Sequence, residues 1–191
     1  MCGRYYIDPD DDMEIQLIID KIKDKFKDTP EISSLRTGEV FPTNIAPVIT
    51  KDSPMPMKWG FSRFDGKGHV INARLETAHE KNMFKRSMEE RRCILPASCY
   101  FEWEKRDGKK QKMEIGAGSP LYMAGLYRFE KDSPLPVFVI LTMAAWPQIS
   151  FIHDRMPVLL SAEIREDWLK GRIDSRDILE MPEAELHYKD A

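Results

Sequence analysis

The sequence predicts a single α+β domain in which strands, joined by hairpins and turns, outnumber helices. Short apolar segments separated by Pro, Gly and Asp-Gly turns recur through most of the 191 residues. Only two or three segments have the 3.6-residue periodicity of an amphipathic helix. This order differs from the regular strand–helix alternation of a parallel α/β sheet. One domain over residues 1–191, with a polar tail at 175–191, can bury a core without disulfides or a metal.

In the first half of the chain, one long helix precedes a series of strands. The apolar face of a helix at 10–27 consists of Ile15, Ile18, Ile19, Ile22 and Phe26, and aspartates occupy its first turn. We then expect a loop at 28–38, an extended segment at 41–49, a turn at Pro54 and Pro56, a strand at 57–61, a turn at 65–68 and a strand at 70–73.

The second half continues as a helix followed by strands. Met83, Phe84 and Met88 form the inward side of a helix at 77–91. Asp107-Gly108 is a strong hairpin signal. Strands are expected at 93–95, 99–103, 112–115, 121–129, 137–143 and 158–160. Ser161 is the expected N-cap of a last helix at 162–170, which Gly171 terminates.

Composition excludes several classes of protein. The net charge of −3 argues against a surface coated with positive charge for duplex DNA, although a few local arginines could still bind a single strand. No apolar run approaches the roughly 20 residues needed to cross a bilayer, and the start lacks a signal-peptide pattern. Three scattered cysteines do not make a disulfide framework, so we expect Cys93 and Cys99 to be buried thiols in a cytosolic protein.

The N-terminus, Met-Cys-Gly-Arg-Tyr, offers chemistry that an internal cysteine lacks. If the initiator methionine is removed, Cys2 carries a free α-amine and a thiol on adjacent carbons. The amine can condense with an aldehyde to an imine, and the thiol can then close a thiazolidine. With a pKa of about 7.7–8.0, roughly a tenth of such an amine is the nucleophilic free base at neutral pH. The alternative is that Cys2 is merely the second residue of a frayed terminus.

Three internal polar residues stand where an apolar strand pattern does not favour them. Asn72 lies between Ile71 and Ala73 in an extended segment. Glu102 lies between two aromatic residues, where burial would suit a general acid, although it could instead face solvent on an alternating strand. His153 follows an apolar stretch and could shuttle protons near neutral pH, although a lone histidine is more often structural.

Arginines accompany these candidate positions. Arg4, Arg74 and Arg155 each lie one or two residues from a candidate catalytic group, which would place anion contacts around one reaction centre. Surface arginines are also common without such a role. The other histidines are not in pairs with metal-ligand spacing, and no glycine-rich phosphate loop or dinucleotide fingerprint is present. We therefore expect neither a metal nor a cofactor.

Six short motifs together resemble the SRAP family, the SOS-response-associated peptidases now understood as abasic-site processing proteins. They are Met-Cys-Gly-Arg-Tyr at 1–5, Asn-Ile-Ala-Pro at 44–47, Trp-Gly at 59–60, Ile-Asn-Ala-Arg-Leu-Glu-Thr at 71–77, Phe-Glu-Trp at 101–103 and Ile-His-Asp-Arg-Met-Pro at 152–157. Each motif is weak alone, but all six occur in the family's order across roughly residues 1–170. The resemblance implies a curved, barrel-like and mostly antiparallel sheet flanked by two to three helices.

The resemblance also implies an activity, the covalent and suicidal capture of abasic sites in single-stranded DNA during the DNA damage (SOS) response. The family's catalytic positions map onto Cys2, Asn72, Glu102 and His153. Glu102 would open the deoxyribose hemiacetal, the amine of Cys2 would attack C1′, and His153 would move protons. Asn72 would position the N-terminal residue or the sugar oxygen. The family name further implies a thiol-type peptidase, and an imine intermediate would permit lyase chemistry.

The predicted DNA-binding residues are Arg4, Asn44, Pro47, Trp59, Arg74 and Arg155. The arginines would hold flanking phosphates, while the tryptophan and Pro47 would stack on or wedge beside neighbouring bases. The expected partner is single-stranded DNA containing an abasic site, bound with little sequence specificity by a monomer without a cofactor. The expected location is the cytoplasm, with nucleoid association after damage and no membrane contact.

Two alternative functions remain open. Met-Cys-Gly also begins N-terminal-nucleophile glutamine amidotransferases, in which the thiol attacks an amide and the α-amine acts as base. The other alternative is a non-catalytic module that binds single-stranded DNA, with Cys2 incidental. One departure from the family pattern concerns the C-terminus. The family continues after its last helix into a strand with a valine–asparagine pair, whereas this sequence ends at 185–191, so we expect a shortened final sheet edge.

Overall fold

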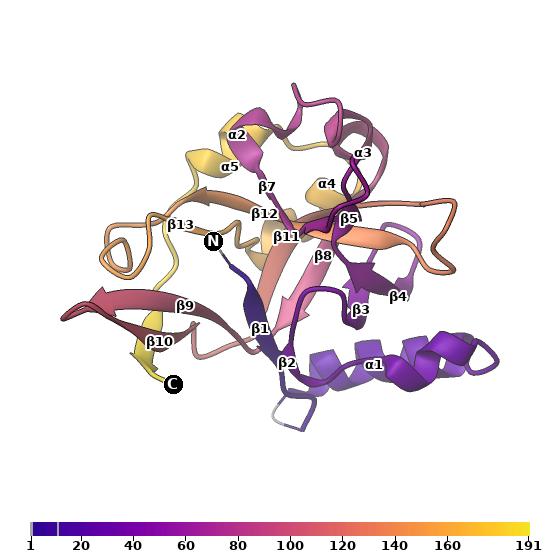
Figure 1. The fold of residues 1–191 in the computed structure, drawn as a ribbon, viewed down its shortest axis with the longest axis horizontal. Helices are drawn as coiled ribbons and strands as arrows, with labels where there is room; N and C mark the ends of the chain where they lie inside the picture. The colour runs from indigo at the N-terminus through magenta and orange to yellow at the C-terminus, as the bar shows by residue number, and fades with distance from the viewer. Residues whose placement is uncertain (1, 11) are drawn as a thin grey trace.

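The computed structural model describes residues 2–10 and 12–191, and a closed five-stranded barrel lies at its centre (Figure 1). The ring runs in the order β11 (Leu121–Arg128), β8 (Arg92–Ala97), β3 (Ile45–Ile49), β4 (Pro54–Trp59) and β12 (Val137–Ala144), which returns to β11. This confirms the predicted α+β class with a barrel-like, mostly antiparallel sheet. The expected removal of Met1 concerns a residue outside the described part of the chain.

Strand β12 pairs with four other strands, two of them parallel and two antiparallel to it. It runs parallel to β4 and β7 (Asn72–Arg74), and antiparallel to β11 and β13 (Arg155–Pro157). Thr142 of β12 lies opposite Arg74 in one pairing and opposite Pro157 in the other. The segments that carry two of the candidate sites, near residues 72 and 153, are thereby anchored to one strand.

A second sheet of five strands carries the N-terminus. Its order is β14 (His187–Asp190), β10 (Lys109–Gly116), β9 (Cys99–Arg106), β1 (Arg4–Ile7) and β2 (Gly38–Val40). The β9–β10 hairpin turns at Asp107 and Gly108, whose φ angles of 52° and 74° confirm the predicted Asp-Gly turn. Figure 1 shows the start of β1 between this hairpin and the β12–β13 pair. The start of the chain is thereby hydrogen-bonded to β9, the strand that carries Glu102.

The C-terminal segment contributes more structure than the prediction of a polar tail allows. It contains helix α5 (Ser175–Leu179) and the four-residue strand β14, which pairs with β10 at the edge of the second sheet. Gln148 fastens this segment to the loop before β13, because its side chain donates to the carbonyl of Ala184 at 2.7 Å and accepts from the N–H of Leu186 at 3.1 Å.

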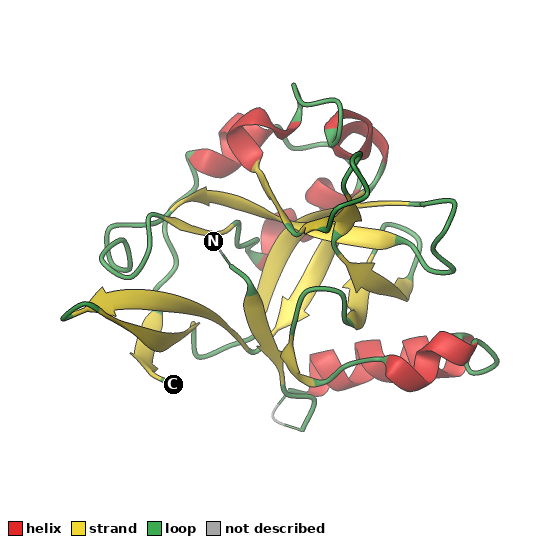
Figure 2. Cartoon of the chain, in the orientation of Figure 1, coloured by secondary structure: helices red, strands yellow, loops and turns green. Residues whose placement is uncertain are grey.

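Five α-helices and two short 3₁₀ helices lie outside the sheets in the described residues (Figure 2). Helix α1 (Met13–Lys25) confirms the predicted amphipathic helix, and Asp12 caps it by accepting from the N–H of Ile15 at 2.8 Å. Asp11, part of the predicted acidic turn, lies outside the described residues. The 3₁₀ helix η1 (Pro30–Ser34) occupies the predicted loop.

The single helix predicted at 77–91 is wrong. The structure instead has α2 (Leu75–Ala78) and α3 (Lys85–Glu90), separated by turns. Leu75 and Phe84 are both buried, yet in one continuous helix they would point about 180° apart at 100° per residue. The break lets both side chains reach the core, where the Phe84 ring lies 6.0 Å from that of Phe61.

The last predicted helix is also divided, into η2 (Ala162–Ile164) and α4 (Arg165–Leu169). Gly171 follows with a φ of 69°, as a helix terminator should, whereas the Ser161 side chain makes no capping hydrogen bond. Ile164 of η2 and Trp168 of α4 are both buried, so the two short helices pack against the core along one side.

The strand predictions require three corrections. Pro54 and Pro56 lie inside β4 rather than in a turn, and Pro56 pairs with Pro47 of β3. The strand predicted at 158–160 is wrong, because β13 ends at Pro157 and only Leu159 of that segment forms an isolated bridge, to Met123. Strands β1 and β2 were not predicted, because β1 gains its hydrogen bonds from β9 and β2, and β2 gains its own from β1, all distant in sequence. A small hairpin, β5 (Phe61–Ser62) with β6 (His69–Val70), flanks the predicted turn at 65–68.

The core fills the barrel and leaves little free space between β8, β11 and β12. A Cβ at Gly125 of β11 would lie 2.4 Å from Leu95 Cδ2 and 2.9 Å from the Val139 carbonyl oxygen. Cys93 and Cys99 are free, buried thiols, as predicted. In the described part of the chain, no helix has both the length and the apolar character needed to cross a membrane.

Candidate active site

Cys2 is held at the start of β1 by a side chain from a distant strand. Nδ2 of Asn72 donates a hydrogen bond to the carbonyl oxygen of Cys2 at 2.9 Å. The Cys2 side chain is fully buried, and its thiol donates to the carbonyl oxygen of Arg4 at 3.6 Å. Residue 2 is therefore fixed within the protein rather than frayed.

Glu102 lies on the inner face of the second sheet, toward Cys2. Tyr100 pairs with the buried Tyr5, Glu102 pairs with the buried Met113, and alternate residues of a strand share a face. Glu102 is only 3% exposed, so the alternative that it faces solvent is wrong. Burial raises the pKa of Glu102, and nearby positive charge, including that of His153, offsets this effect only in part.

The thiol of Cys2 and the carboxyl of Glu102 influence each other. Burial is the largest cause that raises the pKa of the Cys2 thiol, and the negative charge of Glu102 raises it further. At neutral pH the thiol is therefore protonated in this environment. A neutral thiol beside a carboxyl group that favours its acid form is suited to a reaction in which protons move between the two groups.

His153 lies in the loop before β13 and is partly accessible. Its Nδ1 is 3.0 Å from the backbone nitrogen of Arg155 and 2.9 Å from Oδ1 of Asp154. These contacts belong to different proton states, because an N–H donates to a bare Nδ1 whereas a carboxylate requires a proton on it. The backbone bond corresponds to a neutral ring with its proton on Nε2, and Asp154 favours the charged ring. Nδ1 of His153 thus lies within reach of both the backbone N–H of Arg155 and the carboxylate of Asp154.

Three polar atoms around Cys2 have no hydrogen-bond partner among the described residues. They are the hydroxyl groups of Tyr5 and Tyr100 and Oδ1 of Asn72. Burial raises the pKa of both tyrosines, and the charge of a Cys2 thiolate would raise it further, which places them near the thiol. Buried polar groups without partners cost free energy. At this position they could instead bind polar atoms of a ligand.

The predictions that Trp59 and Pro47 contact bases are wrong. Trp59 is fully buried, its Nε1 donates to the carbonyl of Ile71 at 3.0 Å, and its ring stacks on Phe138 with a centroid separation of 6.0 Å. Pro47 is buried inside β3 opposite Pro56. Both residues build the barrel wall beneath the site, and neither has a surface on which a base could stack.

The three predicted arginines have different environments. Arg74 is exposed and remains a candidate phosphate contact. Arg4 pairs with Phe101, so its side chain lies on the opposite face of the sheet from Glu102, where its guanidinium is 5.1 Å from the Trp103 ring. Arg155 is mostly buried and bonded to Glu76, and its contact with a phosphate stays a prediction.

Two further residues need comment. Asn44 shapes the turn before β3, because its Oδ1 accepts from the N–H of Phe41 at 3.0 Å, and its contact with DNA stays a prediction. Glu76 was not predicted as a site residue, although it belongs to the matched motif at 71–77. A carboxylate two residues after a candidate arginine was the available signal, and only the fold shows that its partner is Arg155.

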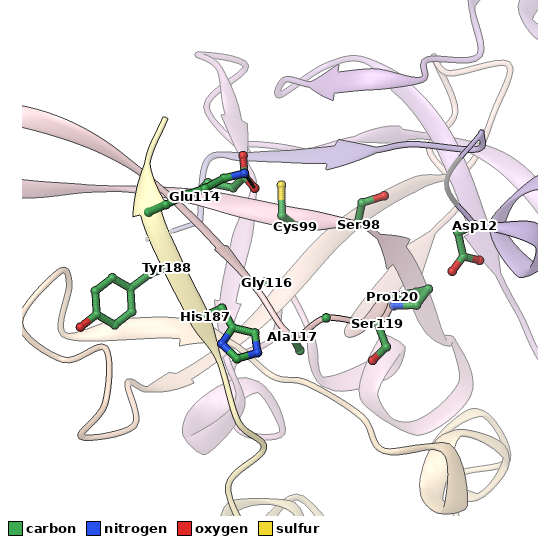
Figure 3. A pocket seen from close by; sticks show the side chains of 12 residues that line it. Asp12, Ser98, Cys99, Glu114, Gly116, Ala117, Ser119, Pro120, His187 and Tyr188 are labelled. Carbon is green, nitrogen blue, oxygen red and sulfur yellow. Dashed lines mark ion pairs between the residues drawn. The ribbon is translucent and has the colours of Figure 1, made fainter.

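A separate pocket of about 360 Å³ lies beside β14 (Figure 3). Its walls include Cys99, Glu114 and His187, and they include none of the four candidate catalytic residues. We therefore place the reaction centre at Cys2 rather than in this pocket. Within residues 2–10 and 12–191, no group of three or more side chains could hold a metal ion.

The sequence of this chain is similar to those of known proteins. A model of the SOS response associated peptidase (SRAP) family matches residues 1–189. The chain is 32% identical to the abasic site processing protein YedK of Escherichia coli, over 95% of this chain and 85% of that protein. It is 31% identical to the abasic site processing protein YoaM of Bacillus subtilis, over 94% of this chain and 84% of that protein.

Solved structures share the fold at lower identity. A protein from Bacteroides thetaiotaomicron superimposes with a TM-score of 0.80 at 22% identity, covering 99% of this chain and 91% of that one. A protein from Bordetella bronchiseptica gives 0.76 at 23% identity, with 100% and 99% covered. From the family match along almost its entire length and these relatives, the chain belongs to the SOS response associated peptidase (SRAP) family.

Proposed function

We propose that this protein captures abasic sites in single-stranded DNA covalently, through Cys2 after removal of Met1. The observation that carries the proposal is the anchoring of Cys2 by Asn72 at 2.9 Å, beside a buried Glu102 whose charge acts on the thiol. Its relatives in Escherichia coli and Bacillus subtilis are named as abasic site processing proteins, which supports the same substrate class. An abasic site in its open form presents the aldehyde that an aminothiol traps.

The chemistry balances with the groups available. The α-amine of Cys2 adds to the C1′ aldehyde to form a carbinolamine, which loses water to give an imine. The thiol sulfur then bonds to C1′, the thiol proton passes to the nitrogen, and a thiazolidine results with net loss of one water. Holding amine and thiol on one residue makes the closure intramolecular, where effective molarities can reach about 10⁵ M or more.

Glu102 and His153 have complementary parts in these proton transfers. Burial favours the acid form of Glu102, which can protonate the sugar oxygen as the ring opens and later relay the thiol proton to the imine nitrogen. His153 is partly accessible and can assist the departure of water from the carbinolamine. Asn72 holds the backbone of residue 2 through Nδ2, and its Oδ1 is left to accept a hydrogen bond from the sugar.

DNA would approach from the exposed side of this centre. Arg74, at the end of β7, is exposed and can pair with a flanking phosphate. Because phosphate contacts carry no sequence information, binding should depend on the lesion and on salt rather than on base sequence. We further propose a monomer that acts in the cytoplasm at damaged DNA, within the SOS response.

Intact mass spectrometry tests the proposal. The protein is incubated with an oligonucleotide that contains one abasic site, and the expected adduct has the summed mass less one water and survives denaturation. Cys2→Ala should abolish the adduct, whereas Cys99→Ala, which changes another buried thiol, should leave it intact. An adduct that persists in Cys2→Ala would contradict the proposal.

The same samples test the other activities. Salt-sensitive binding with no adduct would indicate a binding module, and glutamine hydrolysis would indicate an amidohydrolase. Strand cleavage at the abasic site would reveal lyase chemistry through the imine, and loss of an added N-terminal peptide would reveal a peptidase.

A further inference from the structure

An ion pair outside the four candidate catalytic residues joins the segments that carry two of them. We infer that Glu76 and Arg155 form a positioning pair, which holds the backbone N–H of Arg155 against Nδ1 of His153 and keeps β7, with Asn72, beside it. Neither residue is proposed to touch the reacting atoms. The inference deepens the proposed function and rests on it for its catalytic consequence, although its structural part can be measured without DNA.

The pair has the geometry of a strong interaction. Nη1 and Nη2 of Arg155 donate to Oε1 and Oε2 of Glu76 at 2.6 and 2.8 Å, so the contact is bidentate. Nη2 also donates to the carbonyl oxygen of Thr142 at 2.7 Å. The Arg155 side chain is 13% exposed, and burial reduces the screening that weakens surface ion pairs. Glu76, Arg155 and β12 are thereby tied at one point.

The link to His153 runs through the backbone. Arg155 is the first residue of β13, and its N–H donates to Nδ1 of His153 at 3.0 Å. That bond leaves Nδ1 without a proton and assigns the proton of the neutral ring to Nε2. Asp154 competes for the same nitrogen, at 2.9 Å. When the side chain of Arg155 is fixed, the contact of His153 Nδ1 with the backbone N–H of Arg155 is therefore favoured over its contact with Asp154.

The link to Asn72 runs through α2. Strand β7 pairs with β12, where Asn72 lies opposite Ile140, and the chain enters α2 directly after Arg74. Glu76 is in the first turn of α2, so its bond to Arg155 joins the end of β7 to the start of β13. A shift of either segment would separate the amide that holds Cys2 from the imidazole. In enzymes, misplacement by about 1 Å can cost about 10²-fold in rate.

The tautomer of His153 is the measurement that distinguishes positioning from a general structural role. Imidazole ¹H–¹⁵N spectra of the full chain identify the nitrogen that carries the proton, and the signals are assigned with His153→Ala. Two charged groups act on this ring, Glu102 from β9 and Asp154 from the same loop as His153. The ion pair of Glu76 and Arg155 lies where the loop enters β13. We expect Nε2–H in the native protein.

Glu76→Ala should move His153 toward the Nδ1-protonated form, shift the pH profile of adduct formation and slow adduct formation about tenfold or more. Glu76→Gln keeps the shape of the side chain and should give an intermediate effect, and it serves if Glu76→Ala does not fold. The control is Glu130→Ala. It removes the partner of Arg128 from an ion pair of similar burial at the opposite end of β12, and it should leave the His153 tautomer and the adduct rate unchanged.

The outcomes separate the two proposals. If the His153 tautomer is the same in the native protein, Glu76→Ala and Glu130→Ala, the positioning pair is refuted whatever the adduct rate. If the tautomer changes in Glu76→Ala but the native protein forms no adduct, the positioning pair stands and the proposed function fails. If the tautomer changes and the adduct rate falls, both are supported.

Discussion

Asn72 holds Cys2 in place by a hydrogen bond of 2.9 Å from its Nδ2 to the carbonyl oxygen of Cys2, across 70 residues of sequence. Because the bond reaches the backbone of residue 2, it fixes both the α-amine side and the thiol side of that residue. A nucleophile at a chain terminus would otherwise lose rate to its own conformational freedom.

Asn72→Ala should lower the rate of adduct formation about tenfold or more, because the Cys2 carbonyl loses the side-chain hydrogen bond that holds it. The rate is followed on denaturing gels with excess abasic oligonucleotide. Asn82→Ala changes an exposed asparagine between α2 and α3 and should react like the native protein. Equal rates for the two variants would remove Asn72 from the mechanism.

Glu102→Gln should stabilise the protein while it slows the reaction. The raised pKa of Glu102 means that the folded state loses stability as pH rises from the ordinary value near 4.5 through the raised value. The glutamine variant should therefore gain stability on the order of 1 kcal/mol at neutral pH, or about 2–4 °C in Tm, and the gain should vanish below about pH 4. Thermal melts across pH measure this, and a lower Tm at neutral pH would contradict it.

The pH dependence of stability due to Glu76 should be opposite to that due to Glu102. Hydrogen bonds and charge from Arg155 outweigh burial and lower the pKa of Glu76, so its contribution to stability is present above the ordinary value near 4.5 and is lost as pH falls. Glu76→Gln should thus melt below the native protein at neutral pH, and the two curves should converge in acid. Urea titrations at several pH values provide an independent check.

Trp59→Phe should affect stability rather than DNA contact. The substitution removes the indole N–H from the carbonyl of Ile71, which still accepts from the N–H of Ile140, so the lost hydrogen bond should cost about 0.5–1.5 kcal/mol in free energy of unfolding. Affinity of the folded protein for single-stranded DNA, measured by anisotropy, should be retained because the ring is fully buried. A selective loss of affinity with unchanged stability would restore the base-stacking role.

Arg74→Ala should weaken DNA binding uniformly across sequences and reduce the salt slope by about 1, as expected for one lost phosphate contact. Arg172→Ala removes another exposed arginine, beyond α4, and is the matched control. Salt titrations of binding on two unrelated oligonucleotides separate the two variants. An unchanged salt slope in Arg74→Ala would mean that the DNA strand binds elsewhere on the protein surface.

The amphipathic helix at α1 and the Asp-Gly hairpin could be predicted because their signals are local. Strand β1 could not, since its hydrogen bonds come from β2 and β9, which are about 35 and 95 residues away along the chain. The helix at 77–91 failed for a similar reason. The periodicity of that segment indicated one helix, whereas the need to bury both Leu75 and Phe84 divided it.

At the site, too, the sequence identified candidate residues by their chemistry, whereas their surroundings depend on the tertiary fold. Cys2 was identified by its place at the N-terminus, and Asn72, Glu102 and His153 as polar residues in unfavourable positions. The fold brings the four together, although their catalytic roles remain predictions. Trp59 was matched by motif to a DNA contact, but burial assigns it to the interior, and Arg155, matched in the same way, is bonded to Glu76. No sequence pattern indicates which of several arginines will find an internal carboxylate.

The distribution of the site along the chain has a consequence during synthesis. Cys2 leaves the ribosome first, while Asn72, Glu102 and His153 follow at intervals, and β12 must form before β7 and β13 can pair with it. At about 5–20 residues per second, the segment with His153 is made roughly ten seconds or more after the nucleophile. Under the proposed function, a nucleophile that reacts only once would be consumed if an incomplete chain met another cellular aldehyde. Because its anchor and proton-transfer partners come late, the nascent chain passes through synthesis without the assembled trap.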